Sequence, residues 1–171
     1  MSFLLLDLVV GIFLIIYYIL ESWVLFFIPK SLRMKEIAGQ VALVTGGGSG
    51  MGRLLCLELA KKGCRIVTWD IDEEGNNETV RLLRAYHESS SVNKKHGLER
   101  AINVDSMVYG FKVDLCKRDD VFRVAQLVQK EVGTVDILIN NAGVVSGKSF
   151  LSTSDQQNIL TMNVNAICHF W

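Results

Sequence analysis

The feature that most constrains the fold is a glycine-rich loop between an apolar strand pattern and a helical pattern. The segment VALVTGGGSGMGRLLCLELAKKG covers residues 41–63, and its first four side chains are the aliphatic type found in strands buried on both faces. Glycines allow the backbone to approach an anion without a Cβ clash. Free N–H groups at a helix start, together with the helix dipole, favour a pyrophosphate there. The segment therefore predicts a phosphate-binding turn.

An acidic residue follows at the spacing that a dinucleotide site requires. The apolar run CRIVTWDID predicts a second buried strand that closes on Asp70, roughly 20 residues beyond the loop. A carboxylate there can accept hydrogen bonds from the adenosine ribose and repels a 2′-phosphate, which favours NAD over NADP. Arg53 and Arg65 keep NADP open as the alternative, because either side chain could reach a phosphate. A glycine turn without any ligand is the other alternative.

Strand and helix patterns continue to alternate along the chain. Residues 107–115 and 135–143 predict two further strands, and residues 119–133 predict a helix with Asp119 or Asp120 as its cap. Such alternation predicts an α/β fold with a Rossmann-like, doubly wound parallel sheet, here cut after about four strands. One edge of that sheet and an apolar helix face would then be uncovered.

Three further segments complete this domain, which we place at residues 39–171. NNETVRLLRAY predicts a helix that Asn76 or Asn77 could cap. About 20 residues, 87–106, lack periodicity and predict an exposed insertion, more simply a surface loop than a binding element. STSDQQNILTMNVNAICHFW predicts a helix with a Ser or Thr cap that runs to Trp171.

The N-terminal 29 residues have a different character. Residues 3–28 are nearly all apolar, and a helix of about 26 residues is roughly 39 Å long, more than the hydrocarbon core of a bilayer. Asp7 and Glu21 fall on one stripe with other polar residues, so the helix could span the membrane or lie in its interface. A basic linker, residues 30–38, predicts a cytosolic side. A cleaved signal peptide fits poorly, because no basic n-region or small-residue cleavage site is present.

Composition excludes several classes of protein. The 18 basic and 18 acidic residues give zero net charge, which argues against a nucleic-acid partner. The four cysteines show no CxxC pair and no metal spacing, so we interpret them as reduced thiols in a cytosol-facing domain.

These motifs together resemble the short-chain dehydrogenase/reductase family. Thr45, Gly46, Gly50 and Gly52 match the pattern TGxxxGxG, and Asp70, Asp114, the NNAG of residues 140–143 and Asn163 follow in order. The acid-interrupted apolar arm, WDI, NNAGVVSG and HFW are similar to the membrane-bound retinol dehydrogenases and 17-beta-hydroxysteroid dehydrogenases. The insertion after His87 leans towards the all-trans-retinol dehydrogenase branch.

The resemblance implies a role for each matching position. The glycine loop would hold the pyrophosphate, the end of the second strand the adenosine ribose, the end of the third strand the adenine, and the NNAG segment the nicotinamide ribose. Asn163 would be the catalytic asparagine that holds a water in a proton relay, unless it is only a satisfied helix polar group. Asn141 could equally be a structural amide between strands. The cofactor-binding residues implied are Thr45, Gly46, Gly48, Ser49, Gly50, Met51, Gly52, Asp70, Ile71, Asp114, Leu115, Asn141, Ala142 and Gly143.

One part of the family's chemistry is missing from these 171 residues. The family uses Tyr-x-x-x-Lys after a serine for proton transfer, and that text does not occur. We therefore expect an inactive N-terminal half whose parent, a homodimer, interconverts a lipophilic alcohol and its carbonyl, retinol or a hydroxysteroid, at the endoplasmic reticulum membrane or a lipid droplet. A membrane-tethered or lipid-droplet NAD-binding pseudoenzyme or scaffold is the alternative.

Overall fold

The structure is a computed structural model that describes residues 2–29, 32, 34–93, 106–147 and 149–171. It divides into two compact units, Met1–Glu36 and Ile37–Trp171. The first unit consists mainly of one helix, α1 (Ser2–Phe27). Its segment Leu6–Phe27 has a mean hydropathy of 2.2, and none of it is buried within the protein. By length and composition, this helix can cross a membrane.

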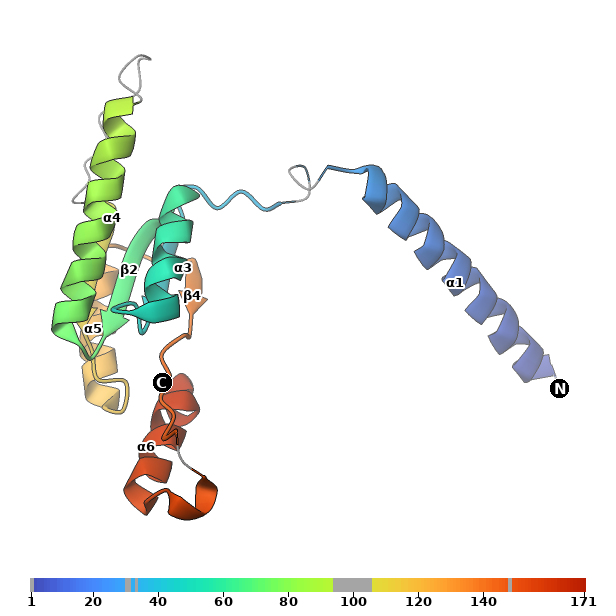
Figure 1. Ribbon diagram of the computed structural model, residues 1–171. Helices are drawn as coiled ribbons and strands as arrows, with labels where there is room; N and C mark the ends of the chain where they lie inside the picture. Colours follow the sequence, from blue (N-terminus) through green and yellow to red (C-terminus); the bar gives the residue numbers. More distant parts are fainter. Residues whose placement is uncertain (1, 30–31, 33, 94–105, 148) are drawn as a thin grey trace. The chain divides into compact units, whose positions relative to one another are not determined.

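The second unit contains a four-stranded parallel sheet in the order β3-β2-β1-β4. Figure 1 labels β2 and β4 of this sheet beside helices α3, α4 and α5. Leu43 lies opposite Val67 on one side and Leu138 on the other, so β1 is central. The predicted α/β, Rossmann-like parallel sheet is confirmed. The strands are β1 (Val41–Thr45), β2 (Arg65–Asp70), β3 (Val108–Lys112) and β4 (Ile137–Ile139). The helices are α3 (Gly50–Lys61), α4 (Glu73–Asn93), α5 (Arg118–Glu131) and α6 (Asp155–Asn165), with short 3-10 turns η2 (Phe150–Ser152) and η3 (Ile167–Phe170).

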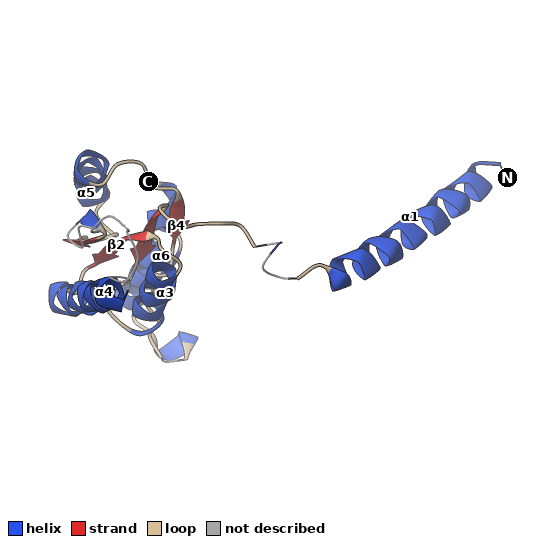
Figure 2. Ribbon diagram, turned by 90° about the horizontal axis from the view of Figure 1, so that it is seen from above, coloured by secondary structure: helices blue, strands red, loops and turns tan. Residues whose placement is uncertain are grey.

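Helices cover both faces of this sheet, with α3 and α4 on one side and α5 on the other (Figure 2). Alternate side chains of β1 pack in the two core clusters on opposite faces of the sheet. Ala42 and Val44 pack in the cluster with Leu83 of α4, whereas Val41 and Leu43 pack in the cluster that contains the valines of α5. All five β1 residues are buried, which explains why the strand reads as a continuous aliphatic run.

Helix α4 differs from its prediction at both ends. It begins at Glu73, so Asn76 and Asn77 lie inside it and the predicted Asn cap is wrong. It continues to Asn93, so the insertion predicted to begin at His87 is wrong for residues 87–93. His87 is buried four positions after Leu83, which is also buried, so a helical face packed on the core extends one turn further than hydrophobicity alone indicates. Residues 94–105 of the predicted insertion lie outside the described residues.

The C-terminal helix is shorter than predicted. Ser154 caps α6 in a reciprocal capping box with Gln157, as a Ser or Thr cap was predicted to do. The helix ends at Asn165, because Ala166 leaves helical geometry with φ −135° and ψ −59°, and a 3-10 turn follows. The prediction of one helix to Trp171 is therefore wrong.

The acidic residues at the start of α5 also differ from prediction. Lys117 occupies the N-cap position and makes no side-chain cap. Asp120 instead accepts a hydrogen bond of 2.9 Å from the backbone N–H of Asp114. That bond and the Arg123 guanidinium hold the pKa of Asp120 below its usual value. Asp120 therefore shapes the loop after β3 rather than capping its own helix.

Candidate functional site

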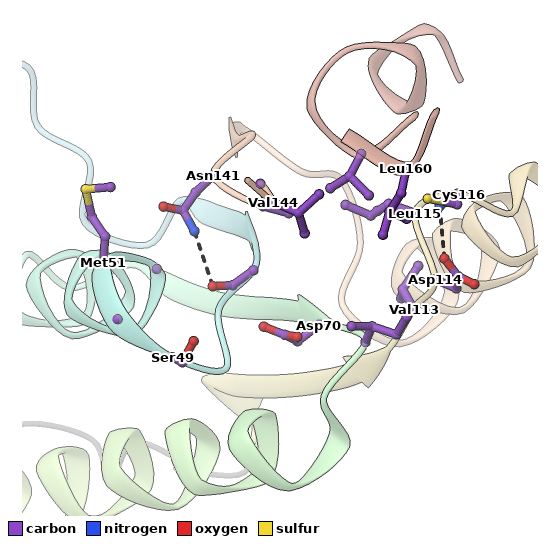
Figure 3. A pocket seen from close by; sticks show the side chains of 17 residues that line it. Ser49, Met51, Asp70, Val113, Asp114, Leu115, Cys116, Asn141, Val144 and Leu160 are labelled. Carbon is purple, nitrogen blue, oxygen red and sulfur yellow. Dashed lines mark hydrogen bonds between the residues drawn. The ribbon is translucent and has the colours of Figure 1, made fainter. Parts of the chain in front are cut away.

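A cleft of about 640 Å³ opens where the strands meet their carboxyl-terminal loops (Figure 3). Four segments that are distant in sequence contribute to it: the glycine loop with the start of α3, the end of β2, the loop after β3, and the NNAG loop with one face of α6. The lining residues are Gly46, Ser49, Gly50, Met51, Gly52, Asp70, Ile71, Val113, Asp114, Leu115, Cys116, Asn141, Ala142, Gly143, Val144, Leu160 and Val164.

Close backbone approach explains the glycines at two positions of the loop. A Cβ on Gly52 would lie 2.1 Å from the carbonyl oxygen of Gly46, so no larger residue fits without moving the loop. A Cβ on Gly48 would lie 2.8 Å from Asp70 Oδ2 and 3.0 Å from the backbone nitrogen of Asn76. The loop is therefore packed tightly against α3 and β2. Ser49 is the N-cap of α3 but makes no side-chain cap, which leaves the helix start available to an anion.

Asp70 stands at the end of β2 with its carboxylate oriented by two backbone N–H groups. Gly48 donates a hydrogen bond of 2.8 Å to Oδ2, and Asp72 donates one of 2.9 Å to Oδ1. An ionised carboxylate has about four acceptor positions, so acceptor capacity remains for the two hydroxyls of a ribose. This geometry fits the adenosine half of a dinucleotide.

The two arginines that kept a 2′-phosphate open are both engaged elsewhere. Arg53 donates to the carbonyls of Gly48 and Gly75 and to Thr79 Oγ1. Arg65 begins β2, about 16 Å along the strand from Asp70 at a strand rise of about 3.3 Å per residue. There its guanidinium donates to the carbonyls of Ser106 and Val132, at the amino-terminal end of β2.

Thr45 and Asn141 join the glycine loop to the NNAG segment. The Thr45 hydroxyl accepts hydrogen bonds of 3.1 Å from the N–H groups of Asn141 and Ala142. The Asn141 amide donates to the carbonyl oxygens of Thr45, at 2.9 Å, and Gly46, at 3.2 Å. Asn141 thus acts as an amide brace between adjacent segments and also lines the cleft. Its cofactor-binding role stays a prediction.

The loop after β3 forms another wall of the cleft. Asp114 Oδ1 accepts a hydrogen bond of 3.0 Å from the N–H of Cys116, and Lys117 lies 3.2 Å from Oδ2. Burial chiefly, with the Asp114 carboxylate adding to it, raises the pKa of the Cys116 thiol. The indole of Trp171 donates to the carbonyl of Leu115 at 3.3 Å, so the C-terminal segment packs behind this wall.

Most of the predicted residues converge on the cleft, and three do not line it. Thr45 and Gly48 lie behind the wall, where they hold Asn141 and Asp70. Asn163 is half-buried on α6 and contributes no surface to the described cleft, whose α6 wall is Leu160 and Val164. The nearby Asn165 makes the stronger contact, because its amide pairs with both the N–H and the carbonyl of Val144, at 2.8 and 2.9 Å.

Sequence reasoning missed five lining residues. Two follow the predicted positions by one residue each, Cys116 after Leu115 and Val144 after Gly143, and Val113 precedes Asp114, so adjacency could have found them. Leu160 and Val164 are four apart on α6, and helical spacing alone gives no reason to place them at a cofactor cleft.

The chemistry of the lining set is that of a binding site. It offers two carboxylates, an asparagine amide and a glycine loop, and the described part of the lining contains no tyrosine, lysine or histidine. No group of three or more metal-ligating side chains occurs among the described residues. A dinucleotide fits this donor set: backbone amides and a helix start for the diphosphate, and a carboxylate for the ribose.

Comparison with known proteins agrees with this geometry. A family profile for short chain dehydrogenases matches residues 40–171. The chain is 44% identical to short-chain dehydrogenase/reductase family 16C member 6 of Bos taurus over 156 residues, which cover 91% of this chain and 43% of that protein. It is 37% identical to retinol dehydrogenase 10 of Homo sapiens over 174 residues, which cover 96% of this chain and 51% of that protein.

Solved structures show the same fold. A short chain dehydrogenase/reductase of Burkholderia phymatum, crystallised in complex with NAD, superposes with a TM-score of 0.65 at 29% sequence identity. The match covers 80% of this chain and 42% of that one. The chain therefore spans about half the length of the curated relatives it matches.

Proposed function

Because the chain belongs to the short-chain dehydrogenase/reductase family, we propose that it forms the cofactor-binding half of an NAD-dependent oxidoreductase that interconverts a lipophilic alcohol and its carbonyl. One observation carries the proposal: the Asp70 carboxylate lies at the end of β2, 2.8 Å from the amide of the glycine loop and beside the start of α3. A ribose and its adjoining diphosphate are complementary to this arrangement, because the ribose hydroxyls can donate to the carboxylate and the diphosphate can accept from N–H groups at the helix start.

Each wall of the cleft would hold one part of the cofactor. The start of α3 would bind the diphosphate, Asp70 and Ile71 the adenosine ribose, and Asp114 with Leu115 the adenine. The NNAG segment would orient the nicotinamide ribose, with Asn141 held in place by Thr45. Bound NAD supplies a nicotinamide that accepts a hydride from the alcohol carbon. In this proposal Asn163 serves the proton relay of the complete enzyme.

The preference for NAD over NADP follows from charge. A 2′-phosphate would stand against the Asp70 carboxylate, where repulsion is uncompensated by either arginine considered for that role. Arg53 is held by three acceptors on the α4 side of the loop. Arg65 lies at the amino-terminal end of β2, whereas Asp70 lies at its carboxyl-terminal end. Like charges in contact disfavour binding, so NADP should bind more weakly.

The apolar helix supports a membrane-soluble substrate. Helix α1 would place the domain at the endoplasmic reticulum membrane or a lipid droplet, into which retinoids and steroids partition, with the cleft facing the cytosol. Several similar proteins bear the name retinol dehydrogenase, which favours retinol, and a hydroxysteroid remains the second substrate of the proposal. We include in it a homodimer as the assembly of the complete enzyme.

The direct test uses the complete protein in phospholipid nanodiscs. We expect reduction of NAD, followed by absorbance at 340 nm, with all-trans-retinol or a hydroxysteroid, and slower reduction of NADP. A water-soluble alcohol such as ethanol is the matched control substrate and should give no rate. Absence of NAD binding by the complete protein would remove the proposal.

A second candidate function is a membrane-tethered NAD-binding scaffold without turnover. It is supported by the presence, in one chain, of an apolar helix long enough to cross a membrane and of a cleft that fits a dinucleotide. Immunoblotting of cells for a stable 19.1 kDa species, joined with NADH binding by that species, distinguishes this function from the enzyme. An active longer product with no species of that mass would exclude it.

A further inference from the structure

Arg53 occupies an unusual position for a charged side chain beside a phosphate-binding loop. It lies on the first turn of α3, and its guanidinium bridges the glycine loop and α4. Its Nη2 donates to the carbonyls of Gly48 and Gly75, the latter at 3.1 Å, and its Nε donates to Thr79 Oγ1 at 2.9 Å. Three acceptors on two elements therefore hold one half-buried cation.

Thr79 extends this contact to the preceding peptide of the loop. Its side chain is fully buried on α4, and its hydroxyl accepts from Arg53. The nearer of the two acceptors for its own proton is the carbonyl of Gly47, at 2.9 Å, and the other is the carbonyl of Gly75, at 3.2 Å. Two consecutive loop carbonyls, those of Gly47 and Gly48, are thus held by the Arg53–Thr79 pair. Both bonds are made to main-chain atoms, so they fix the peptide planes themselves.

The orientation of these peptides determines where their N–H groups point. In a trans peptide the C=O and the following N–H point in opposite directions, and the described residues contain no cis bond. The Gly47–Gly48 peptide shows the consequence: its carbonyl meets Thr79, and its N–H meets Asp70 Oδ2 at 2.8 Å. The Gly48–Ser49 peptide has its carbonyl on Arg53, so the Ser49 N–H must point away from Arg53, and Ser49 lines the cleft.

We infer that Arg53 is a positioning residue for the cofactor: it orients the glycine loop so that the Ser49 N–H and the Gly48-bound carboxylate of Asp70 face the diphosphate and ribose. This inference rests on the proposed function. It assigns Arg53 no contact with the ligand, in contrast to a role as a phosphate ligand. Arg53 acts through main-chain geometry, and Thr79 is its partner.

The test compares dissociation constants for NADH, NADPH and ADP-ribose in the complete protein. Arg53→Met keeps the aliphatic stem and removes the guanidinium with its three hydrogen bonds to Gly48, Gly75 and Thr79. We expect NADH and ADP-ribose to bind about tenfold more weakly, because a displaced Ser49 N–H would lose one charge-assisted hydrogen bond to the diphosphate. The ratio of NADPH to NADH affinity should stay unchanged. Arg53→Lys, which can satisfy one or two acceptors, should recover part of the loss.

Two further variants keep the result interpretable. Arg81→Met removes an exposed arginine of α4 that forms an ion pair with Glu78 at 2.7 Å, and it should leave all three affinities unchanged. Thr79→Val removes the bond to Gly47 without changing charge and should weaken NADH in the same direction, by a smaller factor. Thermal unfolding without ligand reports folding separately for each variant.

Each outcome decides between the alternatives. A selective loss of NADPH affinity in Arg53→Met would make Arg53 a phosphate ligand and overturn the inference. Unchanged NADH affinity in folded Arg53→Met, or in Thr79→Val if Arg53→Met does not fold, would also overturn it. Absence of NADH binding by the unchanged protein would instead overturn the proposed function, and the inference with it.

Discussion

The two sides of the cleft are built differently. On the adenosine side, buried polar groups link the glycine loop, β2 and α4: the fully buried Thr68 and Thr79, and Asn76, whose amide reaches the carbonyl of Phe111 on β3. On the opposite side, α6 has no buried residue, and Ile159, Leu160 and Met162 are exposed. One side is therefore held by buried hydrogen bonds that join several elements, and the other by a few contacts that are open to solvent.

This difference has a consequence for affinity. A preorganised wall binds its ligand without first ordering side chains, so substitutions there should cost binding energy directly. The α6 wall should instead respond in local flexibility.

The largest effect is expected from Asp70→Asn. The variant keeps the shape of the side chain but removes its charge and replaces one acceptor oxygen by an amide nitrogen. In the proposed complex it would weaken the bonds from the ribose hydroxyls, and charge-assisted hydrogen bonds contribute about 1.5–3 kcal/mol. NADH should bind about 10- to 100-fold more weakly in fluorescence titrations, and NADPH should lose much less. Glu74→Gln, an exposed acid in the first turn of α4, is the charge-matched control and should bind NADH normally.

If Asp70→Asn weakened NADH and NADPH equally, the carboxylate would have no part in discriminating the two cofactors. The adenosine wall would then act through shape alone, and the preference for NAD would need another source.

The second effect compares the two glycines at facing walls. Gly52→Ala would place a Cβ 2.1 Å from the Gly46 carbonyl and should lower the free energy of unfolding by about 2 kcal/mol, the typical cost of overpacking. Gly143→Ala would place its Cβ 3.5 Å from Asn165 Oδ1, an ordinary van der Waals distance. Its unfolding midpoint in urea should stay close to that of the unchanged protein. Equal destabilisation by both variants would contradict the contrast between the walls.

Sequence reasoning succeeded where the determinants are close together along the chain. The glycine loop and Asp70 lie within residues 45–70, and they were predicted because strand, turn, helix and acid each have a local pattern. Asn76 was misread as a helix cap because its real partners, Thr68 and Phe111, belong to two different strands. The length of α4 was misjudged because His87 is a polar residue, so the sequence gives no sign that it is buried. Its burial depends on tertiary packing.

The candidate site shows the same limit on its α6 side. Asn163 was singled out by family resemblance, whereas the hydrogen bonds at this end of α6 belong to Asn165. The two asparagines are two residues apart on a helix, so they point to different sides, and only a placed loop could show which one meets Val144.

A third and smaller effect concerns the two hydrogen bonds between the Asn165 amide and the backbone of Val144. Asn165→Ala removes both bonds to Val144, which are partly open to solvent, so the free energy of unfolding should fall by about 1 kcal/mol. Hydrogen–deuterium exchange should accelerate at residues 143–146 and remain unchanged in the glycine loop. Asn163→Ala is the matched control and should leave exchange at residues 143–146 as it was. Faster exchange in both loops would mean that the two walls are coupled more tightly than their contacts suggest.

The smallest effect concerns His87 and the rigid side of the molecule. This imidazole is buried near the end of α4 beside the ring of Tyr86, and burial lowers its pKa below the ordinary 6.5. The neutral form is therefore favoured in the folded state, whereas the unfolded chain takes up a proton near pH 6.5. Stability from this group is full above pH 6.5 and declines as the pH falls through 6.5 towards the lowered pKa. Urea midpoints should consequently decrease from pH 7.5 to 5.5, and His87→Gln should flatten that slope whatever its effect on the absolute midpoint. An unchanged slope in the variant would show that α4 opens to water around His87, and that the rigid wall ends before this turn of the helix.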